Sequence, residues 1–420
     1  MVYMRIGIFT DTYLPVANGI CYVIEIIKKD LEAAGHEVWV VAPRDVRWNL
    51  PKESRIIRFS AIGGVLFKDQ FNSFFWPSKQ LRQIKALNLD LILAFTPSQI
   101  GAFGAYCSAK LDTPYIIQYG TDMEEYAELY KTTTIVGILG SMLLAPYLLK
   151  MGLGESWKFF GGYFIKPDKK LSYYKSITRH ILSALHLHSQ VVIATSEKIA
   201  KKLEAWPIKQ NVEVIPTGVN QLPTDKNYKI YFANKYGLHA DDEIILYAGR
   251  LSVEKNLNLL IDSFELVAQK RPRSKLLLVG DFQYRQNLEQ KTSQSAFKER
   301  IIFTGQIERN ELGSVYELGT VFAFPSITDC QALVLNEAAH AGLPLVWCDE
   351  QSLNSVLKDG LSGLQARNNK NDFASKILKI LNDKKLKNKL GAGANKLAQD
   401  YTEAKQTKKL EKLLQEIIKV

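Results

Sequence analysis

Short apolar runs alternate with amphipathic stretches along most of the chain. Uninterrupted apolar residues followed by turns predict buried strands at residues 5–10, 37–42, 89–95, 115–118, 244–247, 276–279, 301–303, 321–324 and 345–347. Helical spacing predicts helices at residues 21–34, 100–110, 258–270 and 332–342. Because strands that alternate with helices form parallel sheets covered on both faces, the pattern predicts an α/β fold.

The alternation breaks at residues 217–228, where Gly, Pro and polar residues gather as in an interdomain linker. A length of 420 residues fits two domains. We predict two doubly wound (Rossmann-like) domains, residues 1–220 and 221–400, and a C-terminal helix at 401–420 that packs back on the first domain. If the two domains face each other, strand C-termini and any ligand lie in the cleft between them.

The composition is that of a folded globular protein, with 46% hydrophobic and 23% charged residues, and it excludes a disordered or fibrous chain. Four scattered cysteines suggest neither a zinc site nor a disulfide framework and fit a reducing compartment. The N-terminus lacks the long apolar region of a signal peptide.

The formal charge of +11 suits a polyanionic partner. Residues 131–180 hold eight basic and two acidic side chains (8 − 2 = +6), and residues 370–420 hold thirteen lysines against six acids (13 − 6 = +7). The rest of the chain therefore carries 11 − 13 = −2. The excess at 370–420 fits solvated helix faces.

An apolar and basic insertion near 131–180 departs from the alternation. Residues 132–149 contain no charge, and aromatic residues and lysines follow, including Trp157, Lys158 and Phe164. Three Thr, two Gly, a Ser and Pro146 argue against a membrane-spanning helix. Two alternatives remain open here, attachment to an anionic membrane surface and burial against the first domain.

Two strand-to-helix loops carry candidate ligand-binding residues. In residues 11–19, Gly19 would let backbone amides approach an anionic ligand at a helix N-terminus. The loop lacks the GxGxxG pattern of a dinucleotide site. In residues 249–256, Gly249, Arg250 and Lys255 follow a predicted strand, where two cations could hold a diphosphate and stabilise the charge of a leaving group. The alternative is an exposed loop whose cations pair with acids such as Glu254.

A third loop follows the strand predicted at 321–324. Asp329 precedes the helix and Glu337 lies one to two turns inside it, so these carboxylates are too far apart to share a proton. They are better placed to bind separate hydroxyl groups of an extended ligand. The helix N-terminus between them favours anionic groups.

These residues resemble those of glycosyltransferase family 4, whose members have the GT-B fold and retain anomeric configuration. The ordered matches extend over nearly the whole chain. They are residues 10–19, 95–97, 215–218, 249–251, 254–256, 279–281 and 303–305, with Asp329 to Glu337 at the family's paired-glutamate motif. The Thr-Asp-Cys-Gln sequence that ends at Gln331 resembles the Thr-Glu-Thr-Gln version of bacterial diacylglycerol glycosyltransferases and related mannosyltransferases.

The resemblance implies a role for each motif. Arg250 and Lys255 would hold the donor diphosphate, and Glu337 the ribose hydroxyls. Asp329 and the backbone amides near Gln331, Ala332 and Leu333 would bind the donor sugar, while Gly19 would close over the phosphates. The departing phosphate would accept the acceptor's proton. Neither a metal nor another cofactor is expected.

Two departures from the family pattern concern the donor and acceptor sides. The first carboxylate is Asp329 where the family usually has Glu. The family's His that touches the donor sugar falls on Gly120, and Asp122, Glu124 and Tyr126 are the acceptor-side candidates. Asp122 or Glu124 could substitute for that His, or the site could be impaired.

The resulting hypothesis is a metal-independent, retaining transferase that moves a hexose from a UDP- or GDP-sugar to a membrane lipid such as diacylglycerol. It would act in glycolipid or cell-envelope biosynthesis, in the cytoplasm, peripherally on the inner face of the cell membrane. One alternative is a transferase for a soluble or polysaccharide acceptor. Another is a catalytically impaired, membrane-associated protein that binds a nucleotide sugar. Nucleic-acid binding is not favoured, because no recognition module is legible.

Overall fold

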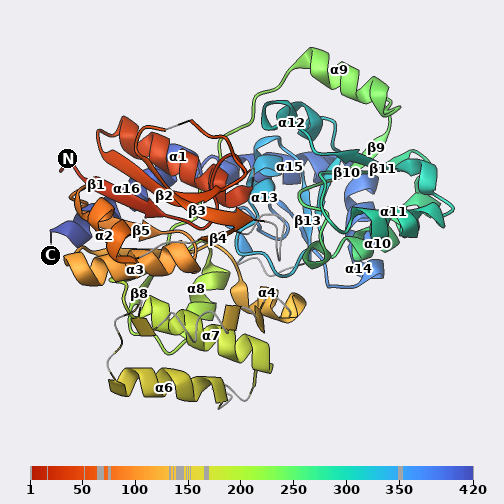
Figure 1. Ribbon diagram of the computed structural model, residues 1–420. Helices are drawn as coiled ribbons and strands as arrows, with labels where there is room; N and C mark the ends of the chain where they lie inside the picture. Colours follow the sequence, from red (N-terminus) through yellow and green to blue (C-terminus); the bar gives the residue numbers. More distant parts are fainter. Residues whose placement is uncertain are drawn as a thin grey trace. The chain divides into compact units, whose positions relative to one another are not determined.

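The computed structural model divides into two compact units, Met1–Thr217 with Gln406–Val420, and Gly218–Lys405 (Figure 1). The division lies near the boundary predicted at residue 220. The structure describes residues 2–419 apart from 17, 52, 64–70, 74–76, 132–133, 136, 139–145, 148, 150, 152, 165–169 and 349–352. Most of the uncharged stretch 132–149 therefore lies outside the described residues.

Within the described residues, the first unit is built on an eight-stranded sheet in the order β4-β3-β2-β1-β5-β6-β7-β8. The strands are β1 (Arg5–Phe9), β2 (Glu37–Asp45), β3 (Ile56–Gly63), β4 (Phe71–Ser73), β5 (Leu91–Ala94), β6 (Tyr115–Tyr119), β7 (Val191–Ala194) and β8 (Asn211–Val214). Strand β4 is antiparallel to β3, and the other neighbours are parallel. Strands β5, β6 and β7 are buried along their whole length, as expected for a sheet covered on both faces.

Helices connect these strands. They are α1 (Gly19–Ala33), α2 (Pro77–Lys85), α3 (Gln99–Leu111), α4 (Met123–Leu129), α6 (Leu153–Phe164), α7 (Tyr173–His186) and α8 (Glu197–Glu204). Helix α3 packs on β1, β2, β5 and β6, whereas α4 and α6 pack on α7 (Figure 1). Helix α16 (Glu403–Ile418) ends the chain, and its residues from Gln406 onward belong to the first unit. Its Leu410 and Leu414 side chains are buried.

The second unit contains a parallel sheet in the order β11-β10-β9-β12-β13-β14. Its strands are β9 (Glu243–Ala248), β10 (Ser274–Val279), β11 (Ile301–Gly305), β12 (Val321–Phe324), β13 (Leu345–Trp347) and β14 (Gly363–Gln365). Its helices are α9 (Lys226–Lys235), α10 (Leu257–Lys270), α11 (Arg285–Ser293), α12 (Arg309–Tyr316), α13 (Leu333–His340), α14 (Lys370–Asn382) and α15 (Lys384–Ala398), with 3-10 turns η1 (Val253–Lys255) and η2 (Lys298–Arg300).

Both sheets reverse their strand order at one point, which confirms the predicted doubly wound fold class. In the second unit the chain moves from β9 to β11 on one side and returns to β12 on the other side of β9. In the first unit the reversal lies between β1 and β5. Ligands of such sheets bind outside the carboxyl ends of the strands at this switch point. The loops that follow β9, β12, β1 and β5 are therefore the places to look for a site.

None of the helices in the described part of the chain combines the length and apolar character needed to cross a membrane.

Candidate active site

The switch point of the second unit brings two predicted motifs to one edge of its sheet. Strand β9 ends at Ala248, and Gly249 and Arg250 follow directly. Its neighbour β12 ends at Phe324, and the loop after it leads to Asp329. Because neighbouring parallel strands end at the same edge, the two loops start side by side.

Two glycines allow the ends of β9 and β10 to approach closely. Gly249 has φ +144° and Gly280 has φ +129°, values that residues with side chains rarely adopt. A Cβ atom on Gly280 would lie 2.0 Å from the carbonyl oxygen of Gly249. Gly249 thus allows the close backbone packing that leads to Arg250, and its part in ligand binding stays a prediction.

Arg250 extends from this turn with part of its side chain accessible. Its guanidinium lies 5.1 Å from the centre of the Phe282 ring, a cation–π contact, and its Nη2 is 3.4 Å from Glu254 Oε1. The Glu254 side chain is buried and also accepts a hydrogen bond from Ser252 Oγ at 2.6 Å. The alternative pairing with Glu254 is therefore realised, and 41% of the Arg250 side chain stays exposed to a ligand.

Lys255 and Asp329 form an ion pair that joins the two loops. Lys255 Nζ donates to Asp329 Oδ1 at 2.5 Å, and both side chains are largely buried, at 14% and 15% exposure. Burial acts to raise the pKa of Asp329, but the Lys255 ammonium outweighs it and the pKa lies below the usual value. Asp329 is therefore ionised at neutral pH and holds the Lys255 cation at the sheet edge.

The backbone at the start of α13 is fixed by one buried amide. Asn354 Nδ2 donates to the carbonyl oxygens of Gln331 and Ala332, at 2.7 and 3.3 Å, and to Asn336 Oδ1 at 2.7 Å. Ala332 has φ +57°, an uncommon conformation for a residue with a Cβ. Leu333 then begins the helix, which ends before Gly342 with φ +74°, as the sequence predicts.

Glu337 lies in the middle of α13 with its carboxylate buried and both oxygens engaged. Arg309 Nη1 donates to Oε1 at 2.6 Å, and Tyr316 Oη donates to Oε2 at 2.8 Å. Burial, and then the negative Glu337, raise the pKa of Tyr316 well above its usual value, so the hydroxyl keeps its proton. Asp329 and Glu337 thus contact different partners.

In the first unit, the loop after β1 is tied to the loop after β5. The buried Asp11 carboxylate accepts from Thr96 Oγ1 at 2.5 Å and from the Ile100 backbone N–H at 2.7 Å. Gly19 begins α1, where the Asn18 side chain caps the helix by accepting from the Cys21 N–H at 3.0 Å. A Cβ atom on Gly19 would meet nothing within 4 Å, so the helix start is open at this point.

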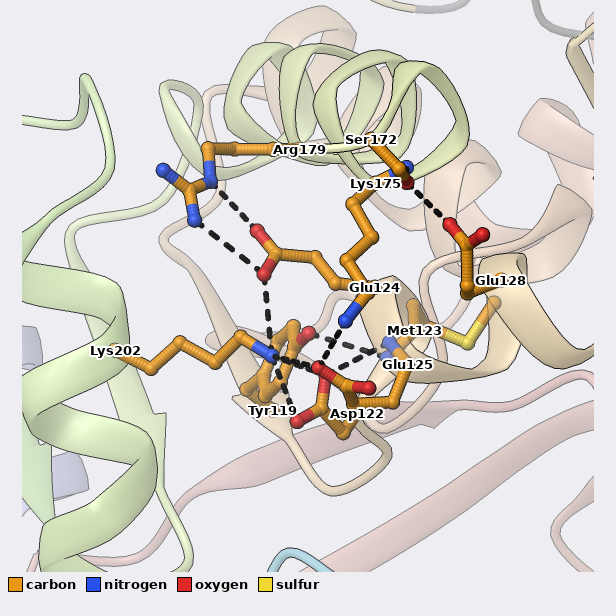
Figure 2. Close-up of polar contacts among 10 residues, drawn as sticks. All are labelled: Tyr119, Asp122, Met123, Glu124, Glu125, Glu128, Ser172, Lys175, Arg179 and Lys202. Atoms are coloured by element: carbon orange, nitrogen blue, oxygen red, sulfur yellow. Dashed lines mark hydrogen bonds and ion pairs between the residues drawn. The ribbon is translucent and has the colours of Figure 1, made fainter. Parts of the chain in front are cut away.

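The acceptor-side candidates Asp122 and Glu124 belong to an ion-pair network that Figure 2 shows. Lys202 Nζ contacts both Asp122 oxygens, at 2.5 and 2.7 Å, and Glu124 Oε2 at 3.1 Å. Arg179 Nε donates to Glu124 Oε1 at 2.6 Å. Burial acts to lower the pKa of Lys202, but the two carboxylates outweigh it and the pKa is raised. The network joins α4 to α7 and α8.

Further contacts extend this network. Lys175 Nζ donates to Glu125 Oε1 at 2.7 Å, and Ser172 donates to Glu128 (Figure 2). The ring of Tyr126 packs against that of Tyr130, with centroids 5.5 Å apart. Gly120 is exposed, with open space around its Cα.

The structure thus groups the predicted residues unit by unit. In the second unit Gly249, Arg250, Lys255 and Asp329 meet at the switch point, and Gln331–Leu333 lead into the helix that carries Glu337. Sequence reasoning missed the residues that contact the candidates. In the second unit these are Arg309, Tyr316 and Asn354. In the first unit they are Arg179 and Lys202, which contact Glu124 and Asp122. A buried carboxylate signals that a partner exists, but the sequence does not say which distant residue it is.

Among the described residues, no group of three or more His, Cys, Asp or Glu side chains is placed to hold a metal ion. None of the described cysteines, Cys21, Cys107, Cys330 and Cys348, forms a disulfide.

Known families match each unit of the chain. The family described as Glycosyltransferase Family 4 matches residues 17–221, and the family described as Glycosyl transferases group 1 matches residues 231–397. The alpha-monoglucosyldiacylglycerol synthase of Streptococcus pneumoniae is 26% identical over 90% of this chain and 78% of its own length. The enzyme of that name from Acholeplasma laidlawii is 22% identical over 99% and 98%.

Among solved structures, the Anabaena protein HepE in complex with UDP and glucose superposes with a TM-score of 0.71, at 16% identity, over 99% of this chain and all of that one. This likeness concerns the fold. The paired doubly wound units and this likeness show the GT-B fold. The two matching families together span most of the chain and show that it belongs to the glycosyltransferases of family 4.

Proposed function

We propose that this glycosyltransferase moves a hexose, with retention, from a UDP- or GDP-sugar to a membrane lipid such as diacylglycerol. The reaction would serve glycolipid or cell-envelope biosynthesis at the cytoplasmic face of the cell membrane. No metal ion or other cofactor is part of the proposal.

The observation that carries the donor half is the pair of cations at the switch point of the second unit. Asp329 anchors Lys255, and the stacked, partly exposed Arg250 extends from the neighbouring strand end. A guanidinium and an ammonium together suit the oxygens of a diphosphate and stabilise charge on a departing nucleotide. In this proposal these side chains take the part that a metal ion plays elsewhere.

Glu337 would bind the ribose hydroxyls of the donor. A carboxylate has about four acceptor positions, and Arg309 and Tyr316 occupy one on each oxygen. The remaining positions suit a pair of neighbouring hydroxyl groups. Arg309 and Tyr316 thereby act as positioning residues. The start of α13 near Gln331 would receive the sugar and phosphate groups.

In the proposed chemistry, the acceptor hydroxyl approaches the face of the sugar from which the nucleotide leaves. The glycosidic bond to phosphate breaks and the new bond forms on that face. The departing phosphate oxygen takes the acceptor's proton, so no separate base is required. Asp122, Glu124 and Tyr126 stay predictions as acceptor-side residues. Asp122 and Glu124 also take part in the ion pairs that hold α4.

The lipid acceptor is supported by likeness and by charge. The relatives from S. pneumoniae and A. laidlawii are both named for diacylglycerol products. Gln331 matches the diacylglycerol-type motif, and residues 131–180 carry a net +6 beside an uncharged apolar stretch. Anionic lipid surfaces attract such basic segments.

A donor screen tests the first half of the proposal. Heat unfolding is measured with UDP, GDP and their sugars, and a nucleotide at 100 times its Kd is expected to stabilise its unit by about 2.7 kcal/mol. Lys255→Ala should remove most of that stabilisation. Lys229→Ala is the matched control, because Lys229 pairs with the exposed Glu317, which precedes β12 and is not part of the loops at the carboxyl ends of the strands. Equal stabilisation of both variants would contradict the donor site.

Nucleotide release with diacylglycerol in anionic vesicles tests the acceptor. Turnover is expected with the lipid, and Arg250→Ala and Glu337→Ala should abolish it. Activity confined to soluble sugars would contradict the proposed lipid acceptor. Nucleotide binding without turnover on any acceptor would support the impaired, binding-only alternative.

A further inference from the structure

Helix α6 carries three strongly exposed apolar side chains on one side. Leu153, Trp157 and Phe164 are 85%, 77% and 80% exposed, the highest values among the large apolar side chains that the structure describes. At 100° per residue their spacings of 4 and 11 residues place them within about 40° of one another around the helix. These three residues, called here the α6 stripe, lie on one side of the helix.

Another face of α6, about 100–140° around the helix from the stripe, is fixed to α7. Phe159 and Tyr163 are buried, and the Phe159 ring stacks on His180 with centroids 5.3 Å apart. His180 Nε2 lies 2.8 Å from the Phe159 carbonyl oxygen, and a Cβ atom on Gly162 would collide with the His180 ring. Figure 1 shows α6 lying along α7. Because these contacts fix α6 to α7, the stripe stays exposed to solvent.

Lysines surround the α6 stripe in the sequence. Residues 150–170 hold Lys150, Lys158, Lys166, Lys169 and Lys170 against Glu155 and Asp168, a net charge of 5 − 2 = +3. Lys158 is exposed on α6 itself. An outward apolar line with a tryptophan and flanking lysines has the composition of an interfacial helix, which buries its apolar side between anionic headgroups.

We propose that the α6 stripe docks this chain on an anionic lipid bilayer, with Leu153, Trp157 and Phe164 inserted at the level of the headgroups. The inference rests on the proposed lipid acceptor and names the surface that brings the enzyme to it. A second copy of the chain fits less well, because a two-fold contact through α6 would oppose lysines with lysines.

Depth-dependent quenching tests the location of Trp157 directly. The full chain is mixed with phosphatidylglycerol-rich vesicles whose acyl chains carry bromine, and tryptophan fluorescence is recorded. Quenching is expected for the wild type, and Trp157→Phe should still bind but lose most of the quenching. Binding without quenching of Trp157 would overturn the proposal.

Sedimentation with the same vesicles compares two sets of exposed residues. The substitutions Leu153→Ser, Trp157→Ser and Phe164→Ser together should lower the fraction bound at least tenfold. The control is Ile230→Ser with Tyr231→Ser, an exposed pair on α9 at 61% and 56% exposure, which should change binding less than twofold. Lys158→Glu should weaken binding more at low salt than at high salt.

The outcomes separate this inference from the proposed function. If the wild type does not bind anionic vesicles, or if the α6 substitutions leave binding unchanged, the proposed docking surface is wrong. This holds even if the enzyme transfers sugar to a lipid. If the α6 substitutions convert a dimer into a monomer, the stripe contacts a second copy of the chain and the inference is overturned. If α6-dependent binding occurs without transfer to any lipid, the docking surface stands and the proposed acceptor fails.

Discussion

At the scale of single residues, Glu337 shows how a buried carboxylate is held in one position. Arg309 and Tyr316 come from α12 and each holds one of its oxygens. The motif places Glu337 in the sequence, but its two partners lie 28 and 21 positions away and belong to no motif. The sequence therefore predicts this carboxylate as a candidate site residue and misses the residues that orient it.

Tyr316→Phe tests this orientation. The variant should lose about 1 kcal/mol of unfolding free energy with the hydrogen bond. It should also weaken binding of the nucleotide found in the donor screen, because the carboxylate is held from one side only. Tyr236→Phe removes a comparable hydrogen bond, to the Thr304 carbonyl oxygen at 3.0 Å, and should leave nucleotide affinity unchanged. Calorimetric titration measures both, and equal affinities would contradict the positioning role.

His186 gives the first unit a sensitivity to acid. Its side chain is fully buried, and burial lowers its pKa to about 4 from 6.5. Because the folded state resists protonation, the stability present above pH 6.5 is lost as the pH falls from 6.5 towards 4, by about 3 kcal/mol in all. His186→Phe should flatten this decline, as followed by hydrogen exchange in β6 and β7. His239→Phe, an exposed site, should leave the decline unchanged.

At the scale of elements, nine of the fourteen described strands were predicted, because apolar runs indicate strands of a sheet that is buried on both faces. Strands β3, β4, β7 and β14 were not predicted, and neither were most of the described helices, whose residues are more mixed. Strands predicted at 5–10, 244–247 and 321–324 are observed as β1, β9 and β12. Strand β8 was missed because it lies at the sheet edge and alternates exposed with half-buried residues. Helix α6 was not resolved from the insertion because its outer face is apolar too.

The network of Figure 2 joins three helices of the first unit, and Lys202 is its central cation. Lys202→Ala should destabilise that unit by about 3 kcal/mol or more, since it removes the cation that contacts both oxygens of the buried Asp122 and one of the two cations that contact Glu124. Lys201→Ala is the matched control, because Lys201 is the exposed neighbour on α8 and its loss should cost little. Urea unfolding distinguishes the two, and a similar small loss in both would show that the network contributes little to stability.

At the scale of the whole molecule, the boundary between the two units falls within the last helix, α16. Its first residues, up to Lys405, belong to the second unit, and Gln406–Val420 belongs to the first. Leu414→Ala removes a fully buried side chain and should destabilise the first unit by about 2–5 kcal/mol. Leu390→Ala, in α15, should do the same to the second unit. Hydrogen exchange in β1 and β9 reports on each unit. Equal loosening of both units by either substitution would contradict this division.

The divided first unit also has a consequence during synthesis. The ribosome makes residues 1–217 first and Gln406–Val420 only after the whole of the second unit. The second unit is continuous and can complete its core while the chain still grows, whereas the first must wait with the site of Leu410 and Leu414 unfilled. The N-terminal unit is thus the last to complete its core.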